Sequence, residues 1–121
     1  MSKSLGEFEQ LLLFALLQLP EAEAYGVPIR DLVERRTGRT LSAGAVYTAL
    51  DRLQEKGLVS SHESDPTPER GGRRKRLYRL EPAGARALAR AVETFQAMSH
   101  GLLPRLESVV AGHGHPGGRR A

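Results

Sequence analysis

The strongest chemical signal in this sequence is a concentration of positive charge in the stretch ERGGRRKRLYRL, residues 69–80. Between Glu69 and Arg79 it holds six cations and one carboxylate, which gives +5. The whole chain carries only +4 at pH 7, so the remaining residues sum to −1. Charge gathered in one place is typical of a surface that meets a polyanion in a defined orientation. A solvated loop without a partner is the alternative interpretation.

No set of residues in the sequence is arranged for catalysis. His62, His100, His113 and His115 are scattered along the chain, and no carboxylate pair is placed to join them. The chain has no cysteine, which excludes disulfides and thiolate zinc sites. His113 and His115 could hold a metal ion, but such tails are usually solvated. We therefore expect no metal site, no cofactor and no enzymatic activity.

Length and hydropathy favour a single cytoplasmic domain. A chain of 121 residues suits one domain with a modest core. The longest wholly apolar run, residues 11–17, is too short to span a bilayer, and the N-terminal MSKSLGEFEQ lacks the layout of a signal peptide. The absence of cysteine fits a reducing compartment. We expect no association with membranes.

Two helices are expected before residue 40. The first covers residues 5–19, where apolar residues recur with helical spacing at Leu5, Phe8, Leu12, Ala15, Leu16 and Leu19. The second begins at Pro28, a residue suited to the first position of a helix, and ends before Gly38.

The third helix, residues 42–57, has the clearest local signals. Ser42 is a good N-cap, and Gly57 can take the left-handed position that ends a helix. Counting back from Gly57 makes Leu53 and Leu58 the hydrophobic pair of a Schellman ending. Val46 lies on one face with Leu50 and Leu53, and this face should be buried.

Two short strands and a long helix complete the chain. The strands are LVSSHE and RKRLYRL, joined by the Pro- and Gly-rich SDPTPERGGR, residues 64–73. Glu81 and Pro82 open a last helix with a heptad seam formed by Ala85, Leu88, Val92, Phe95, Ser99, Leu102, Leu106 and Val109. Gly101 and Pro104 predict a kink or break near residues 100–104. The tail, residues 112–121, should be disordered.

This order of elements predicts a mainly α fold with a small two-stranded wing, that is, a winged helix-turn-helix with a C-terminal dimerisation helix. The third helix fits the major groove of DNA, while the wing brings cations to the phosphates. The expected DNA-binding residues are Ser42, Gly44, Ala45, Tyr47, Thr48, Arg52, Arg70, Arg73, Arg74, Lys75 and Arg76. Asp51 and Glu55 limit contact to the N-terminal half of the helix. For Tyr47, a partly buried core position is the alternative to a backbone contact.

The seam on the last helix could dock on the core of its own domain or on a second subunit. Its length exceeds what so small a domain can easily cover, which favours a homodimer. The expected dimerisation residues are Leu5, Phe8, Leu12, Leu88, Val92, Phe95, Leu102 and Leu106. The predicted domains are a winged helix-turn-helix at residues 1–80, a dimerisation helix at 81–111 and a disordered tail at 112–121.

Three segments resemble the PadR family of bacterial transcriptional regulators, especially its short subgroup with a single C-terminal helix. They are AYG at residues 24–26, GAVYTALDRLQEKGLV at 44–59 and ERGGRRKRLYRLEPAGARAL at 69–88. The resemblance implies a winged helix, a homodimer formed through the first and last helices, and repression at a palindromic operator. Some relatives bind planar aromatic ligands, but with no Trp, three Phe and three Tyr the chain gives little support for a stacking pocket. Whether a small-molecule inducer exists stays open.

The expected function is sequence-specific binding of double-stranded DNA to regulate transcription, most simply as a repressor. The alternative is a winged helix that binds RNA or protein without operator specificity, because the fold alone does not determine the partner. Single-stranded RNA is usually held by aromatic side chains on a sheet, and the predicted strands offer only Tyr78.

Overall fold

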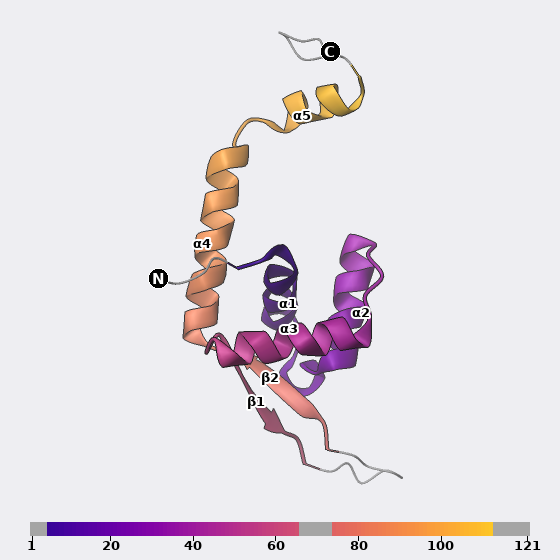
Figure 1. The fold of residues 1–121 in the computed structure, drawn as a ribbon, viewed down its shortest axis with the longest axis vertical. Coiled ribbons are helices and arrows are strands. Elements are labelled where there is room, and N and C mark those ends of the chain that lie inside the picture. The colour runs from indigo at the N-terminus through magenta and orange to yellow at the C-terminus, as the bar shows by residue number, and fades with distance from the viewer. Residues whose placement is uncertain (1–4, 66–73, 113–121) are drawn as a thin grey trace. The chain divides into compact units, whose positions relative to one another are not determined.

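The computed structural model describes residues 5–65 and 74–112, which fall into two units that meet between Ala91 and Val92. The first unit contains α1 (Glu7–Gln18), a 3-10 turn η1 (Glu21–Glu23), α2 (Gly26–Thr37), α3 (Ala43–Glu55), β1 (Val59–Glu63), β2 (Arg76–Leu80) and the first half of α4 (Pro82–Ser99) (Figure 1). The second unit contains the rest of α4 and α5 (Leu103–Val110). Each unit is described by itself.

The core of the first unit lies where α1, α2 and α3 contact one another and β1 contacts α3. Its most deeply buried large side chains are Leu12, Leu13, Ile29, Val46, Leu50, Leu53 and Val59. They come from all three helices and from β1. The helical spacing identified Leu12 of α1 and the buried face of α3, whereas Leu13 lies outside the predicted α1 stripe. Of the described residues, no helix is long and apolar enough to cross a membrane.

Helix α3 begins and ends as its sequence predicts. The Ser42 Oγ accepts a hydrogen bond from the Ala45 N–H at 3.1 Å, which confirms the N-cap. At the other end Gly57 has φ +76°, the Leu58 N–H donates to the Leu53 carbonyl at 3.0 Å, and the Gly57 N–H donates to the Gln54 carbonyl at 2.9 Å. These two bonds define the predicted Schellman ending.

The start of α2 differs from the prediction. The helix begins at Gly26, two residues before Pro28, so the proline takes the third position instead of the first. N–H groups of the first helical turn have no partner inside the helix, and a proline there removes no bond. Gly38 ends the helix in the left-handed conformation, with φ +77°.

The strands form a two-stranded antiparallel hairpin in which Ser61 lies opposite Tyr78 and Glu63 lies opposite Arg76. Alternate residues of a strand face opposite sides of the sheet, so Ser61, Tyr78 and Arg76 share one face. Val59 and Tyr78 bury this face in the core. The arrangement of three helices followed by this hairpin confirms the predicted winged helix-turn-helix.

Between α4 and α5 the helical path is interrupted. Helix α4 ends at Ser99, Gly101 adopts φ +74°, and α5 begins at Leu103 with Pro104 in its first turn. A proline at the start of a helix costs no hydrogen bond, whereas in the middle it would break the ladder. Gly101 and Pro104 therefore separate two helices here.

Candidate nucleic-acid interface

The outward face of α3 is open and, in its N-terminal half, uncharged. Gly44, Ala45 and Thr48 are exposed there, and Ser42 caps the helix end beside them. A Cβ added to Gly44 would meet nothing within 4 Å. The next turn of the same face adds the exposed Arg52. Short side chains of this kind would let another molecule approach the helix backbone closely.

Tyr47 is partly exposed and also packs against a neighbouring helix. Its side chain is 41% exposed, yet its ring packs on the first residue of α2. A Cβ on Gly26 would overlap the ring and hydroxyl, and would lie only 2.8 Å from Cε1. A side chain larger than hydrogen at position 26 would therefore displace Tyr47. No local signal around Gly26 predicts that it provides this space.

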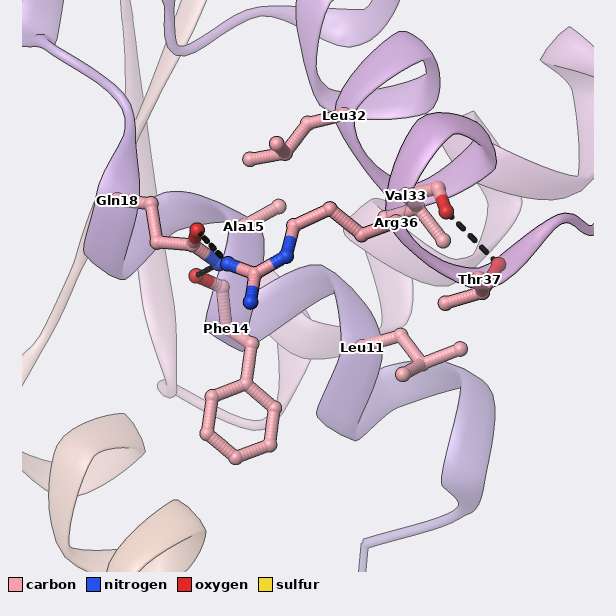
Figure 2. Close-up of a pocket in the computed structure, with 8 residues that line it drawn as sticks. All are labelled: Leu11, Phe14, Ala15, Gln18, Leu32, Val33, Arg36 and Thr37. Atoms are coloured by element: carbon pink, nitrogen blue, oxygen red, sulfur yellow. Dashed lines mark hydrogen bonds between the residues drawn. The ribbon is translucent and has the colours of Figure 1, made fainter.

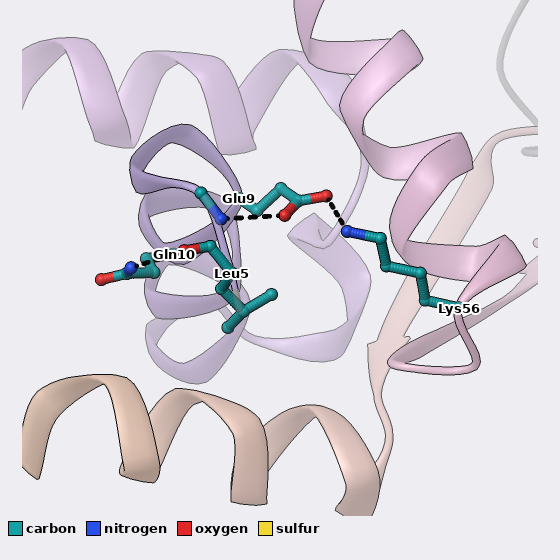
Figure 3. Close-up of polar contacts among 5 residues, drawn as sticks. Leu5, Glu9, Gln10 and Lys56 are labelled. Carbon is teal, nitrogen blue, oxygen red and sulfur yellow. Dashed lines mark hydrogen bonds and ion pairs between the residues drawn. The ribbon is translucent and has the colours of Figure 1, made fainter. Parts of the chain in front are cut away.

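Two polar contacts hold the ends of α3. At its entry, the Glu34 Oε2 on α2 accepts the Leu41 N–H at 2.7 Å. At its exit, the Lys56 Nζ donates to the Glu9 Oε2 on α1 at 2.8 Å, and the other Glu9 oxygen accepts the Gly6 N–H (Figure 3). Neither contact could be read from the sequence, because the partners are separated by 7 and 47 residues.

These contacts shift the pKa of the Glu9 carboxyl. Partial burial raises its pKa, but the hydrogen bonds from Lys56 and Gly6 outweigh burial and hold the pKa below its usual value. The charged form of Glu9 is therefore the form that stabilises the junction between α1 and the end of α3.

The wing presents three of its predicted cations within the described residues, and all three are exposed: Arg74, Lys75 and Arg76. Arg70 and Arg73 lie outside the described residues. The Lys75 N–H donates to the Ser64 Oγ at 2.9 Å, and the Ser64 N–H returns a bond to the Lys75 carbonyl at 2.8 Å. The Lys75 ammonium lies 4.9 Å from the centre of the Tyr25 ring. These bonds continue the hairpin towards its tip.

Arg76 and Arg79 are engaged within the chain. The Arg76 Nε donates to the Ser61 Oγ at 3.2 Å, and its guanidinium lies 5.9 Å from the centre of the Tyr78 ring. On the opposite face of the hairpin, Arg79 pairs with Glu21 of η1 at 2.9 Å. Tyr78 itself is buried, and burial raises the pKa of its hydroxyl although nearby Arg76 acts in the opposite direction.

The predicted dimerisation residues fall into two groups. Leu5, Leu12 and Leu88 are buried in the core of their own unit, Leu12 at 0% and Leu88 at 4% exposure, and Phe8 packs partly against it. Burial within the protomer leaves these three leucines little exposed surface, and their role in a dimer stays a prediction. Val92 is half-buried, while Phe95, Leu102 and Leu106 are exposed, Phe95 at 72%.

A cavity of about 300 Å³ lies between α1 and α2, away from the predicted DNA-binding residues (Figure 2). Its lining is mainly apolar, from Leu11, Phe14, Ala15, Leu32 and Val33. At its polar side Arg36 donates to the side chain of Gln18. Within residues 5–65 and 74–112, no group of three or more His, Asp or Glu side chains is placed to hold a metal ion.

Comparison with known proteins agrees with this geometry. The structure of a PadR family transcription regulator from Clostridium difficile R20291 has a TM-score of 0.66 and 27% identity, and the match covers 84% of this chain and 99% of that one. A complex structure of hsRosR-S4 has a TM-score of 0.64 and 26% identity, covering 92% and 90%. A PadR-like regulator from Bacillus cereus shares the fold at 19% identity, with a TM-score of 0.65 over 82% of this chain and 90% of that one.

A curated relative is the uncharacterized 37.1 kDa protein in transposon TN4556 of Streptomyces fradiae, 32% identical over 87 residues. The match covers 72% of this chain but only 23% of that protein, so this chain corresponds to about a quarter of its length. The sequence profile of the transcriptional regulator PadR-like family matches residues 15–90, which include α2, α3 and both strands. The chain belongs to the PadR-like family of transcriptional regulators.

Proposed function

We propose that this regulator binds double-stranded DNA sequence-specifically and acts as a homodimeric repressor at a palindromic operator. In this proposal residues 1–80 form the DNA-binding domain and residues 81–111 supply the dimer contact. Residues 113–121 of the expected disordered tail lie outside the described residues. The N-cap Ser42 and the α3 residues Gly44, Ala45, Tyr47, Thr48 and Arg52 face the DNA, together with the wing cations Arg70, Arg73, Arg74 and Lys75. Membership of the PadR-like family supports a role in transcription.

The observation that carries the proposal is the exposed face of α3. Its N-terminal half is small, uncharged and open above Gly44, while the acidic Asp51 and Glu55 come later on the helix. A helix that enters the major groove by its N-terminal end brings its first turns closest to the base edges. Thr48 can there donate or accept a hydrogen bond or touch a thymine methyl group. The acidic residues would be kept away from the phosphates.

The wing provides the electrostatic part of the proposed contact. Arg74 and Lys75 are exposed next to the hairpin tip, and Arg70 and Arg73 of the same segment add two further charges. Each cation that neutralises a phosphate releases a counterion and adds about 0.9 to the slope of log K against log salt concentration. The wing should therefore contribute affinity and salt dependence, and α3 should contribute sequence preference.

Dimerisation is supported by the apolar side chains beyond Val92. Phe95, Met98, Leu102 and Leu106 are all more than half exposed, and exposed large apolar residues at this density are costly in a monomer. A two-fold dimer would present two copies of α3 to half-sites about 34 to 36 Å apart, the repeat of one DNA turn. Occupation of such a site would block transcription sterically.

The test is selection of bound duplexes from a random DNA pool, followed by salt titration of the selected sequence. We expect a palindromic sequence, a steep salt slope, and a loss of about one slope unit for Arg74→Ala. Thr48→Ala should change the preferred bases and leave the slope unaltered. Enrichment of no sequence, or of RNA alone, would refute specific recognition of duplex DNA. Equal losses on all sequences from both variants would refute the division of labour between α3 and the wing.

A further inference from the structure

One wing cation, Arg76, is held by side chains from both β1 and α3. Arg76 lies on the face of the hairpin that it shares with Ser61 and Tyr78, and this face is turned to α3. Its Nε donates to the Ser61 Oγ at 3.2 Å, and its Nη2 approaches the Gln54 Oε1 on α3 at 3.4 Å. The guanidinium thus contacts both β1 and α3.

The hydrogen bonds around Arg76 form a chain with consistent direction. The Ser61 Oγ accepts from Arg76 and donates its single hydrogen to the Gln54 Oε1 at 2.9 Å. The Gln54 oxygen has two lone pairs and accepts from both Ser61 and Arg76. Bonds connected in this way polarise one another and order all three side chains together. Gln54 and Ser61 are also partly buried, which reduces competition from water.

A third restraint comes from Tyr78. The guanidinium lies 5.9 Å from the centre of the Tyr78 ring, within the range of a cation–π contact. Tyr78 is 2% exposed, and its N–H donates to the Ala24 carbonyl at 2.7 Å, so the ring is fixed in the core. Arg76 therefore connects α3, both strands and a core residue.

We propose that Arg76 is a positioning residue that sets the angle of the wing against α3 through Ser61 and Gln54, and is not a phosphate ligand. The inference deepens the proposed function and rests on it, because positioning matters only if α3 and the wing engage one duplex together. Specific binding needs both elements to reach the groove and the phosphates at once. A loose wing would keep its charge but lose this simultaneous fit.

The neighbouring Arg74 provides the contrast. It is exposed, and among the described residues no hydrogen bond or ion pair involves its side chain. Its charge is available to a phosphate, where lysine can replace arginine as a point charge with little loss. At position 76 a lysine would keep the charge but could not span both Ser61 and Gln54 with one planar group.

The experiment is a double-mutant cycle with Arg76→Lys and Gln54→Met, measured on the selected operator and on random duplex. Neither change alters the net charge of the wing, so the salt slope should stay constant. We expect each single variant to weaken operator binding roughly three- to tenfold, the equivalent of one lost hydrogen bond. The double variant should bind as tightly as the single variant with the lower affinity. Binding to random duplex should be unchanged. Arg79→Lys, on the opposite face of the same strand and outside the proposed interface, is the matched control and should bind like the wild type.

Two results of this experiment would overturn the proposal. If Arg76 binds a phosphate, Arg76→Lys will bind nearly normally and Gln54→Met will have no effect, which overturns the proposal. Losses that multiply in the double variant also overturn it. Melting temperature and active fraction, measured for every variant, separate these outcomes from partial unfolding.

A measurement without DNA separates this inference from the proposed function. In the nitrogen-15-labelled free protein, the Arg76 Nε–H should exchange with water on the order of tenfold more slowly than the Arg74 Nε–H, and Ser61→Ala should remove the difference. Equal exchange in the wild type would refute the network. A protein that shows the slow Arg76 signal yet selects no duplex would retain the network and refute the proposed function.

Discussion

Gly84, in the first turn of α4, should be intolerant of alanine. A Cβ at this position would overlap the Leu58 carbonyl oxygen and lie 3.1 Å from its carbon and 2.8 Å from the Leu80 Cδ1. The Leu58 oxygen also accepts the Glu81 N–H at 3.0 Å, so this piece of backbone is held by the residue directly before α4. The obstacle is main chain, which cannot swing aside as the end of a side chain can.

Two opposing terms determine the size of the effect. Replacing glycine by alanine in a helix gains at most about 1 kcal/mol. Overpacking against backbone costs about 1 to 3 kcal/mol, and the upper end applies where main chain must shift. We therefore expect Gly84→Ala to lower the free energy of unfolding by about 2 kcal/mol net. For a chain of this size the melting temperature should fall by roughly 8 °C.

Gly44→Ala is the matched control, because it places the same methyl group on a helix where nothing lies within 4 Å. It should raise the free energy of unfolding by about 0.5 to 1 kcal/mol. Both variants and the wild type are unfolded by heat and by urea at one protein concentration, since a dimer melts in a concentration-dependent way. A Gly84→Ala protein as stable as the wild type would show that the contact between α4 and Leu58 is not as close as described.

Three further outcomes are expected. The pKa of Glu9 is held below its usual value, so its stabilising contact with Lys56 is present above pH 4.5 and is lost as the pH falls through the folded-state pKa. Glu9→Gln should cost about 0.5 to 1 kcal/mol at pH 7, and urea unfolding should show this difference vanishing in acid. Gly44→Ala, although stabilising, should weaken operator binding roughly tenfold in a titration, because a methyl group enters the α3 face; unchanged affinity would contradict close approach. Phe95→Glu with Leu106→Glu should halve the mass measured by light scattering at micromolar concentration, and an unchanged mass would exclude this dimer face.

Local rules predicted α3 accurately. The Ser42 cap, the Gly57 ending and the buried positions 46, 50 and 53 all depend on hydrogen bonds and spacings within a few residues of the helix. Such features are determined by neighbouring residues, so a sequence contains what is needed to place them. The exposed face opposite the stripe then follows from helical geometry.

Contacts between distant segments could not be predicted in this way. In the sequence, all the cations of residues 70–79 look equivalent. In the structure, Arg79 pairs with Glu21, 58 residues away, and Arg76 reaches Gln54, 22 residues away. Which cation stays available depends on the register of the hairpin and on the elements that cover each face. The tight space at Gly26 likewise depends on a residue from another helix, Tyr47.

The apolar stripe of the last helix shows a related limit. Periodicity identified a face that contains both Leu88 and Phe95, but Leu88 is buried in the first unit while Phe95 is largely exposed. The spacing of apolar residues indicates which side chains should be buried, but it does not indicate which other segment or subunit buries them. The apolar stripe therefore looks uniform in the sequence, although its first part is buried in the core and its later part is exposed.

Polar contacts at three places orient helix α3, while its buried apolar face packs it against the core. Glu34 holds its entry, Glu9 holds Lys56 at its exit, and Gln54 connects it with the wing. These contacts are exposed or half-buried, so each contributes little to stability, whereas removing a core leucine such as Leu50 would cost about 2 to 5 kcal/mol. Binding of DNA by α3 and the wing together depends more strongly on the angle between these two elements than the free energy of unfolding does. Substitutions at the polar contacts should therefore reduce specific affinity well before they lower the melting temperature, and core substitutions should do the reverse.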